Sequence, residues 1–377
     1  MIYLDNNATT KISKHVYFKQ CEILNKFYGN PSSLYPLGVS IADLIADARR
    51  NIASFIRAEN TEDRIIFTSC ATESNNSVLH SALFPQPKGK HIVISRVEHP
   101  SVLNAAAYYQ SLGCRVSYAD VNQDGELDEA QLAAQINEDT VLVSVMLVNS
   151  ETGVIHNVSR IAEAVKRLKP DVLVHTDAVQ AAGKIPIDVA ALGVDFLTLS
   201  GHKFHAPKGV GALYVKSGVK FIPLLHGGHQ EGGLRAGTEN TASIVAMGEA
   251  AVLAREALNS GAVAQIKMFR DEMELQLKRL FPDSVIFGEK APRVGNTTNI
   301  GFRGIPGSML VLKLADRGIC VSSGTACNSK STEPSQVLRA MRAPDEFIHS
   351  IRISLSSETK EDEIHGLLSA LREIISK

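Results

Sequence analysis

Short apolar runs alternate with amphipathic segments over roughly residues 60–215. The segments between the runs have helical spacing; one begins after Thr72, and the others cover residues 101–112, 129–136 and 161–168, with Ser101 as the expected N-cap of the second. Strands that are apolar on both faces and separated by helices are typical of a mainly parallel sheet covered on both sides. We therefore predict an α/β fold, with strands at residues 65–68, 91–95, 115–119, 141–147, 172–175, 196–199 and 211–215.

A glycine-rich stretch at residues 227–237 interrupts this alternation. Two long helical segments follow it, at residues 242–258 and 263–280, and the rest of the chain mixes short strands and helices. We predict a large domain of residues 15–258. Residues 1–14 and 259–377 are then expected to form a smaller α+β domain.

Composition and charge exclude several classes of function. The chain has 377 residues, of which 44% are hydrophobic and 21% charged, and its formal net charge is -1. No field of one sign is present to hold nucleic acid or an anionic membrane. No apolar run has the length of a membrane span, and the first residues lack the pattern of a secretory signal. We expect a cytoplasmic protein without direct nucleic-acid or membrane contacts.

The cysteine pattern argues against a metal site. The chain has 5 cysteines, an odd number, and no two of them form a C-x-x-C pair. Neither a structural zinc site nor a disulfide framework is expected.

Polar side chains follow several of the expected strands. Thr72, His99, Asn149, Asp177 and Lys203 each come shortly after an apolar run. Ligands of parallel sheets bind beyond the carboxyl ends of the strands. These positions are therefore candidates for one ligand site.

Lys203 ends the sequence Ser-Gly-His-Lys after the expected strand at 196–199. A lysine in a partly desolvated position has a lowered pKa and can form a Schiff base. The alternative is an ordinary solvated surface lysine.

Asp177 follows another expected strand, and Gln180 comes three residues later. The acid could pair with the protonated ring nitrogen of a pyridoxal cofactor, with Gln180 near the ring hydroxyl. It could equally be a simple helix N-cap.

Residues 68–73 join a strand to a helix and contain several hydroxyl groups. Hydroxyls and unpaired backbone N–H groups at a helix start form an anion site. A capping box based on Ser69 or Thr72 is the alternative. The phosphate-binding motifs G-x-x-x-x-G-K-[ST] and G-x-G-x-x-G are absent, which argues against nucleoside triphosphates and dinucleotides.

Cys327 lies in a small, polar stretch at residues 321–330, close to Lys330. An exposed thiol beside a cation is a candidate nucleophile, because the thiolate is the reactive form. An incidental surface cysteine fits the same stretch.

Together, and in this order, these features resemble the cysteine desulfurases, a branch of the class V aminotransferase family. The resemblance covers nearly the whole chain, and the Cys327 segment is similar to the branch with the longer loop, that of the iron–sulfur and nitrogen-fixation enzymes. The matching segments are residues 3–10, 29–33, 71–76, 98–99, 148–153, 175–180, 200–203, 230–231, 235–238, 322–327, 333–335 and 351–355.

The resemblance implies the type I fold of pyridoxal 5'-phosphate enzymes, which is that of aspartate aminotransferase. It also implies that Lys203 carries the cofactor and moves the substrate Cα proton. His99 would stack on the cofactor ring and assist proton transfer, and Asp177 would bind the ring nitrogen.

Further roles follow from the same resemblance. Gln180 and Asn149 would lie near the phenolate oxygen of the ring or the substrate, and Arg352 would bind the substrate carboxylate. The remaining cofactor-binding residues that it implies are Ala71, Thr72, Ser200 and His202, with Thr238 reaching the phosphate in the other subunit of a homodimer.

The implied reaction converts L-cysteine to L-alanine. The Cys327 thiolate would attack the substrate sulfur and keep it as a persulfide, which an acceptor protein then takes. The resemblance leaves that acceptor open among iron–sulfur assembly, tRNA thiolation and DNA sulfur modification. One departure from the family pattern is Cys70, which replaces a glycine beside the phosphate turn.

Three alternatives share parts of this interpretation. A selenocysteine lyase would use the same chemistry on the selenium analogue. Another class V pyridoxal-phosphate enzyme would keep Lys203 and Asp177 but would not need Cys327. A non-catalytic scaffold would need none of the three.

Overall fold

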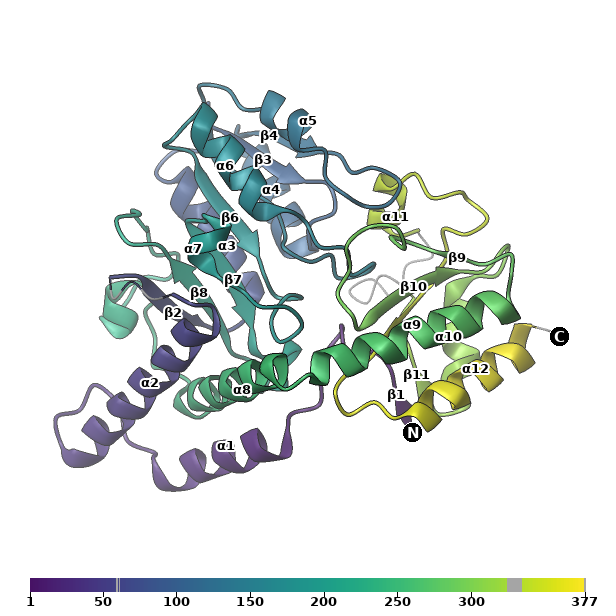
Figure 1. Cartoon of the computed structure of the whole chain (residues 1–377). Helices are drawn as coiled ribbons and strands as arrows, with labels where there is room; N and C mark the ends of the chain where they lie inside the picture. Colours follow the sequence, from purple (N-terminus) through teal and green to yellow (C-terminus); the bar gives the residue numbers. More distant parts are fainter. Residues whose placement is uncertain (59, 61, 324–333, 376–377) are drawn as a thin grey trace.

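The computed structural model describes residues 1–58, 60, 62–323 and 334–375. Its centre is a sheet of 7 strands in the order β2-β8-β7-β6-β5-β3-β4, all parallel except β8, which is antiparallel to both neighbours. The α/β prediction with a mainly parallel sheet is thus confirmed (Figure 1). The strands are β2 (Arg64–Thr68), β3 (His91–Ser95), β4 (Arg115–Ala119), β5 (Thr140–Ser144), β6 (Leu173–Asp177), β7 (Phe196–Ser200) and β8 (Gly211–Val215).

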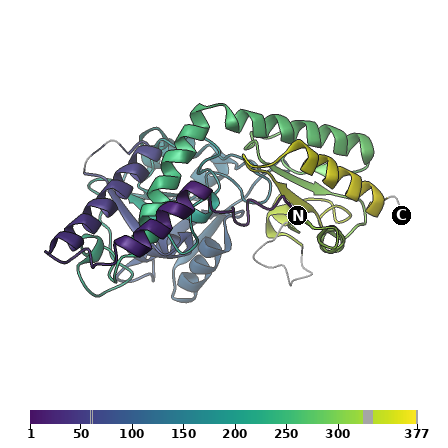
Figure 2. The same ribbon diagram turned by 90° about the horizontal axis from the view of Figure 1, so that it is seen from below.

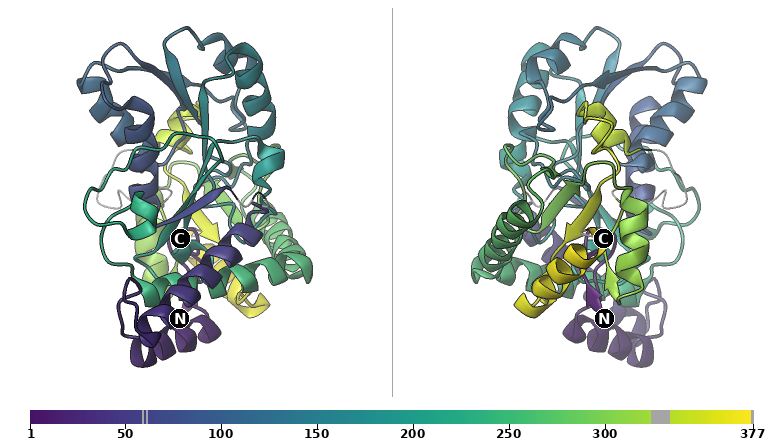
Figure 3. Two further views of the ribbon diagram at one scale, coloured as in Figure 1. Left: turned by 90° about the vertical axis from the view of Figure 1, so that its left-hand side faces the viewer. Right: turned by 90° about the vertical axis from the view of Figure 1, so that its right-hand side faces the viewer.

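Both faces of the sheet are buried, because alternate side chains of a strand pack into apolar cores on opposite sides of it. On β3, Val93 belongs to one apolar core, while Ile92 and Ile94 belong to the other. Helices flank the strands on both sides (Figure 3). These helices are α3 (Ala71–Leu83), α4 (Pro100–Ser111), α5 (Glu129–Ala134), α6 (Val158–Leu168), α7 (Val189–Leu192) and α8 (Thr241–Asn259).

Several boundaries differ from the sequence prediction. The strand expected at residues 141–147 ends at Ser144, and the helix expected from residue 161 begins at Val158 because the Asn157 side chain caps it. The expected Ser101 cap is wrong. Helix α4 begins at Pro100, and His99 is its N-cap.

Two helices precede the sheet, α1 (Lys14–Lys26) and α2 (Pro36–Phe55). Helix α2 crosses α8 so closely that a Cβ atom on Gly248 would lie 2.6 Å from the Ala48 Cα. Figure 2 shows α1 and α2 at the end of the molecule away from the two termini.

The remaining elements surround a separate apolar core that includes Leu4, Leu310 and Ile353. Strand β10 (Thr297–Gly301) pairs antiparallel with β9 (Val285–Ile286) and β12 (Ile351–Ser354), while β1 (Ile2–Tyr3) pairs parallel with β11 (Ile319–Cys320). The N-terminal segment therefore packs with the C-terminal part of the chain. The helices here are α9 (Ala262–Leu280), α10 (Gly307–Ala315) and α12 (Glu361–Ile375), while α11 (Gln336–Ala340) packs in another apolar cluster, with Val97 and Val121.

None of the helices in the described part of the chain is long and apolar enough to cross a membrane.

Candidate active site

A cavity of about 630 Å³ lies where the central sheet meets the N-terminal segment and β12. That volume suits a cofactor or small-molecule ligand. Strands β6 and β7 end at this cavity, as expected for a ligand site of a parallel sheet. The predicted site residues that line it are Ala71, Thr72, His99, Asp177, Gln180, Ser200, His202, Lys203 and Arg352.

Lys203 lies in a short 3-10 turn, Gly201–Lys203, directly after β7. Its Nζ donates hydrogen bonds to the main-chain oxygens of Asn7, at 2.6 Å, and Ala8, at 2.8 Å. The N-terminal segment therefore orients the lysine within the cavity, and Lys203 is not an ordinary surface lysine.

Asp177 is the last residue of β6 and is buried. Its Oδ2 accepts a hydrogen bond from Asn75 Nδ2 at 2.8 Å, and its Oδ1 accepts one from the Val179 main-chain N–H at 3.0 Å. The carboxylate is thus held from two sides at one end of the cavity.

The other end of the cavity is suited to an anion. Helix α3 begins there, and its N-cap, Cys70, makes no side-chain capping hydrogen bond. The capping box considered for Ser69 or Thr72 is therefore wrong. Unpaired N–H groups and the helix dipole favour a negative charge at such a terminus.

His202 lies beside this anion-binding end. Burial, together with the neighbouring charges of Lys203 and Lys208, lowers the pKa of His202 to about 4. The ring is therefore neutral near pH 7, and its Nδ1 lies 3.1 Å from Thr9 Oγ1.

These residues fit pyridoxal 5'-phosphate. An acid for the ring nitrogen lies at one end of the cavity and a phosphate-type site with Thr72, Ser200 and His202 at the other. Lys203 lines the same cavity, as a covalent link to the cofactor requires.

Arg352 projects from β12 and is buried. Its guanidinium donates to Asp5 Oδ1 at 2.9 Å and to the Ser150 main-chain oxygen at 3.1 Å. Within the described residues its Nε has no hydrogen-bond partner. Two anchors thus fix the orientation of a cation that lines the cavity.

Two buried carboxyl groups at the cavity were not singled out from the sequence. Burial raises the pKa of Glu98 to about 8, although Ser95 Oγ and the Met146 N–H both donate to it at 2.6 Å. Burial likewise raises the pKa of Glu151 to about 7, against the lowering effect of a hydrogen bond from Ser335. Glu98 directly precedes His99 in the sequence, and this place beside a predicted site residue could have pointed to it.

Lys184 and Asn7 were also not singled out. Lys184 is buried, and burial, with the charges of Lys203 and Arg352 nearby, lowers its pKa well below the usual value. Its Nζ donates to Asn7 Oδ1 at 3.0 Å and to Gln180 Oε1. Lys184 comes four residues after Gln180 in the sequence, and this spacing from a predicted site residue could have pointed to it.

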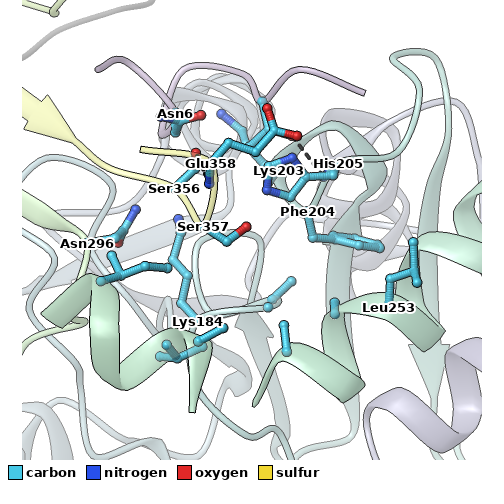
Figure 4. A pocket seen from close by; sticks show the side chains of 18 of the residues that line it. Asn6, Lys184, Lys203, Phe204, His205, Leu253, Asn296, Ser356, Ser357 and Glu358 are labelled. Atoms are coloured by element: carbon cyan, nitrogen blue, oxygen red, sulfur yellow. Dashed lines mark hydrogen bonds between the residues drawn. The ribbon is translucent and has the colours of Figure 1, made fainter. Parts of the chain in front are cut away.

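A second cavity, of about 170 Å³, lies behind Lys203. Lys184 and Lys203 are both among its lining side chains, together with Asn296 and the segment Ser356–Glu358 (Figure 4). The two lysines therefore face one small cavity whose other walls are largely apolar, and Lys203 also lines the main cavity.

Two of the predicted site residues that the structure describes, Asn149 and Thr238, do not line the main cavity. The Asn149 amide oxygen accepts from the N–H groups of Glu151 and Thr152, at 2.9 Å and 3.0 Å, and so holds a turn. Thr238 lines a separate cavity with Arg235 and Glu231. Cys327 lies outside the described residues.

Comparison with known proteins places these features in a family. Residues 2–367 match the family "Aminotransferase class-V". The whole chain is 44% identical to "Cysteine desulfurase 2" of Trichormus variabilis, over 94% of that protein, and 40% identical to "Cysteine desulfurase NifS" of Azotobacter vinelandii, over 93% of it.

Solved structures agree. A "NIFS-LIKE PROTEIN" superposes with a TM-score of 0.91 at 36% identity, covering 100% of this chain and 99% of that one. A NifS-like protein from Rickettsia africae superposes with a TM-score of 0.90 at 33% identity, covering 100% of each chain. These likenesses confirm the predicted type I fold of pyridoxal-phosphate enzymes.

The chain therefore belongs to the class V aminotransferase family. Within that family it belongs with the cysteine desulfurases, which depend on pyridoxal phosphate.

Proposed function

We propose that this cysteine desulfurase converts L-cysteine to L-alanine and carries the released sulfur as a persulfide on Cys327. The observation that carries the proposal is the common cavity of Lys203, Asp177 and Arg352. It brings together a cofactor-binding lysine, an acid for the ring nitrogen and a cation for the substrate carboxylate. The relatives named as cysteine desulfurases support the substrate.

Each residue has a distinct task at the cofactor. Pyridoxal phosphate, when bound, withdraws electrons from the substrate Cα and so makes its proton acidic. Asp177 keeps the ring nitrogen protonated, and the N-terminus of α3 with Ala71, Thr72, Ser200 and His202 binds the phosphate. Gln180 lies near the phenolate oxygen, and Asn149 holds the turn that leads to Glu151.

Lys203 accepts the Cα proton through its Nζ and returns it during the reaction. Arg352 binds the substrate carboxylate, a task for which the planar guanidinium is suited. His99 stacks on the ring and assists proton transfer. All three side chains line the main cavity, which makes this division of labour geometrically consistent.

Cys327 supplies the nucleophile. Its thiolate attacks the substrate sulfur and a sulfur–sulfur bond forms on Cys327. The carbon–sulfur bond breaks, and its electron pair stays with the substrate Cβ, which takes up a proton to become the methyl group of L-alanine. Described residues on both sides of the Cys327 segment support this role. Ser322 exchanges main-chain hydrogen bonds with Arg352, at 2.7 Å and 3.1 Å, and Pro334 lines the cavity.

The chain is proposed to act as a homodimer. Large apolar side chains are exposed on and between α1 and α2, among them Tyr28, which is 80% exposed, and Leu34, which is 96% exposed. Exposed large apolar side chains that are concentrated in one part of the chain are typical of a protein interface. Thr238, outside the main cavity, would contact the phosphate bound by the partner subunit.

We also propose a division into two domains, a location and a kind of sulfur acceptor. The large domain comprises residues 15–258, and residues 1–14 and 259–377 form the small domain, a division supported by the separate apolar core around Leu310. The enzyme acts in the cytoplasm. Its sulfur goes to an acceptor protein whose identity is open, without direct contact with nucleic acid or a membrane.

The test is to incubate the pyridoxal-phosphate-loaded protein with L-cysteine carrying radiolabelled sulfur. Label that stays on the protein until a reducing agent releases it, in amounts equal to the alanine formed in one turnover, is the expected result. Cys327→Ala should form no labelled protein, whereas Cys21→Ala, which removes an exposed cysteine of α1, should behave like the wild type.

The alternatives give different results. Full alanine production by Cys327→Ala would point to another class V enzyme, and a large rate preference for selenocysteine would point to a lyase. A protein that takes up no cofactor would be a scaffold.

A further inference from the structure

A buried chain of side chains links the two residues expected to face the cofactor ring. It runs from Asp177 through Asn75 and Ser101 to His99. Asn75 is 0% exposed, Asp177 is 4% exposed and Ser101 is 9% exposed, so water does not compete for these contacts.

The direction of each hydrogen bond in the chain can be worked out. Asn75 Nδ2 donates one proton to Asp177 Oδ2 at 2.8 Å and the other to Ser101 Oγ at 2.9 Å. A reversed amide would bring its oxygen against the Asp177 carboxylate, which only accepts, so the orientation is fixed. Asn75 Oδ1 has no hydrogen-bond partner in the part of the chain that the structure describes, so nothing there favours reversal.

The bond from Asn75 also restricts the Ser101 hydroxyl, whose proton does not point at Asn75. Its oxygen accepts from Asn75, so its single proton is available to His99 Nδ1, 2.8 Å away. The Ser101 main-chain N–H, which can only donate, also points to His99 Nδ1, at 3.1 Å. One ring nitrogen thus receives two donors.

We infer that Asn75 and Ser101 are positioning residues that hold His99 in the tautomer with its proton on Nε2. A proton on Nδ1 would oppose the Ser101 main-chain N–H and break that contact, and the Ser101 hydroxyl would have to turn its own proton away from the ring. His99 therefore presents a donor at Nε2, while Nδ1 anchors the ring to the start of α4. The hydrogen bonds stand without the proposed function, and only their consequence for proton transfer rests on it.

Asp177 and His99, at the two ends of this series of hydrogen bonds, are coupled through the Asn75 amide. Asp177 as a carboxylate holds Asn75, Asn75 holds Ser101, and Ser101 holds His99. The residue that binds the ring nitrogen thereby influences the orientation of the residue that stacks on the ring.

The experiment uses the holoenzyme with histidine isotopically labelled at both ring nitrogens. The protonated and unprotonated nitrogens of a neutral imidazole have widely separated NMR resonances, and His99→Gln identifies the signals of His99 among the 12 histidines. The wild type and Ser101→Thr, which keeps a hydroxyl, should both carry the proton on Nε2.

Ser101→Ala removes the hydroxyl but not the main-chain donor. Its His99 signals should shift towards a mixture of tautomers. The kcat for L-cysteine should fall about three- to tenfold, the worth of one hydrogen bond, while KM stays the same. Asn75→Ala, which frees the hydroxyl to turn, should act in the same direction. Ser77→Ala removes a buried hydroxyl of α3 that takes no part in these hydrogen bonds. It should change neither the His99 NMR signals nor kcat.

A wild-type His99 protonated on Nδ1 would overturn the inference. So would a Ser101→Ala protein with unchanged signals and kcat, because the main-chain N–H alone would then fix the ring. Failure of the proposed function is distinguishable. A wild type that makes no alanine from cysteine would contradict that function, while the NMR signals would still decide the tautomer.

Discussion

Lys203 and Lys184 donate to the same residue: Lys203 Nζ binds the main-chain oxygen of Asn7 at 2.6 Å, and Lys184 Nζ binds its side-chain oxygen at 3.0 Å. Asn7 lies two residues after Asp5, which pairs with Arg352. The N-terminal segment thus holds the two lysines and Arg352 next to the cavity. Their spacing depends on a stretch of chain far from them in sequence.

Replacing Lys184 should weaken cofactor binding without removing the catalytic lysine. In Lys184→Met, Gln180 Oε1 loses the only partner that it has among the described residues, and the amide is then held only by the bond from its Nε2 to the Asn7 main-chain oxygen, at 2.9 Å. A lost hydrogen bond of about 1 kcal/mol corresponds to about a fivefold higher Kd for pyridoxal phosphate. Fluorescence titration of the apoenzyme measures it.

Lys216→Met, on the exposed surface after β8, is the matched control and should leave the Kd unchanged. Equal Kd values for Lys184→Met and the wild type would mean that Gln180 needs no such anchor.

Arg352→Lys should separate substrate binding from cofactor binding. A lysine keeps the charge but cannot bind a carboxylate in bidentate fashion, and it cannot keep both contacts to Asp5 and Ser150. We expect kcat/KM for L-cysteine to fall about 100-fold, a loss of about 2.7 kcal/mol. The visible absorbance of the bound cofactor should remain. Loss of that absorbance would instead assign Arg352 to the cofactor site.

Many strands and helices of this fold could be predicted because each depends on residues that are close together in the sequence. Strand β3 was predicted at its observed residues, His91–Ser95, since its three consecutive β-branched apolar residues at 92–94 favour a strand that is covered on both faces. Lys203, Asp177 and His99 could be predicted because each follows such a strand. The resemblance to a known family supplied their roles.

The contacts of Lys184 and Asn7 could not be predicted in the same way. They depend on the N-terminal segment packing against β12 and the turn after β7, which no periodicity shows. The capping of α4 was missed for a related reason. Ser101 has the side chain of an N-cap, but Pro100 fits the first helical position, which makes His99 the cap.

Glu151 should make the stability of the protein depend on pH. Its pKa is raised by burial from 4.5 to about 7, so the folded state keeps a proton that the unfolded chain loses. The contribution is fully present below pH 4.5 and is lost as the pH rises to 7. The difference of about 2.5 pKa units corresponds to about 3 kcal/mol as an upper value.

Glu151→Gln removes this titration. Its free energy of unfolding, measured in urea between pH 4.5 and 7.5, should therefore rise relative to that of the wild type as the pH increases. Glu163→Gln, on the exposed face of α6, should run parallel to the wild type. Parallel curves for Glu151→Gln would mean that the carboxyl is ionised in the folded state.

The exposed apolar residues on and between α1 and α2 should be needed for dimerisation. They should also be needed for activity, because the dimer brings Thr238 to the phosphate site of the other subunit. In the double variant Tyr28→Asp and Leu34→Asp, two charges would have to be buried in the interface, which costs several kcal/mol. Light scattering should then give the mass of one 40.7 kDa chain where the wild type gives twice that mass. Cofactor affinity should fall as well, because the phosphate loses the Thr238 of the other subunit. Leu312 of α10 is 67% exposed, and Leu312→Asp is the control for a charge on an apolar surface elsewhere. A wild type that is monomeric and fully active would contradict the shared site, and Thr238 would then have no role in binding the cofactor.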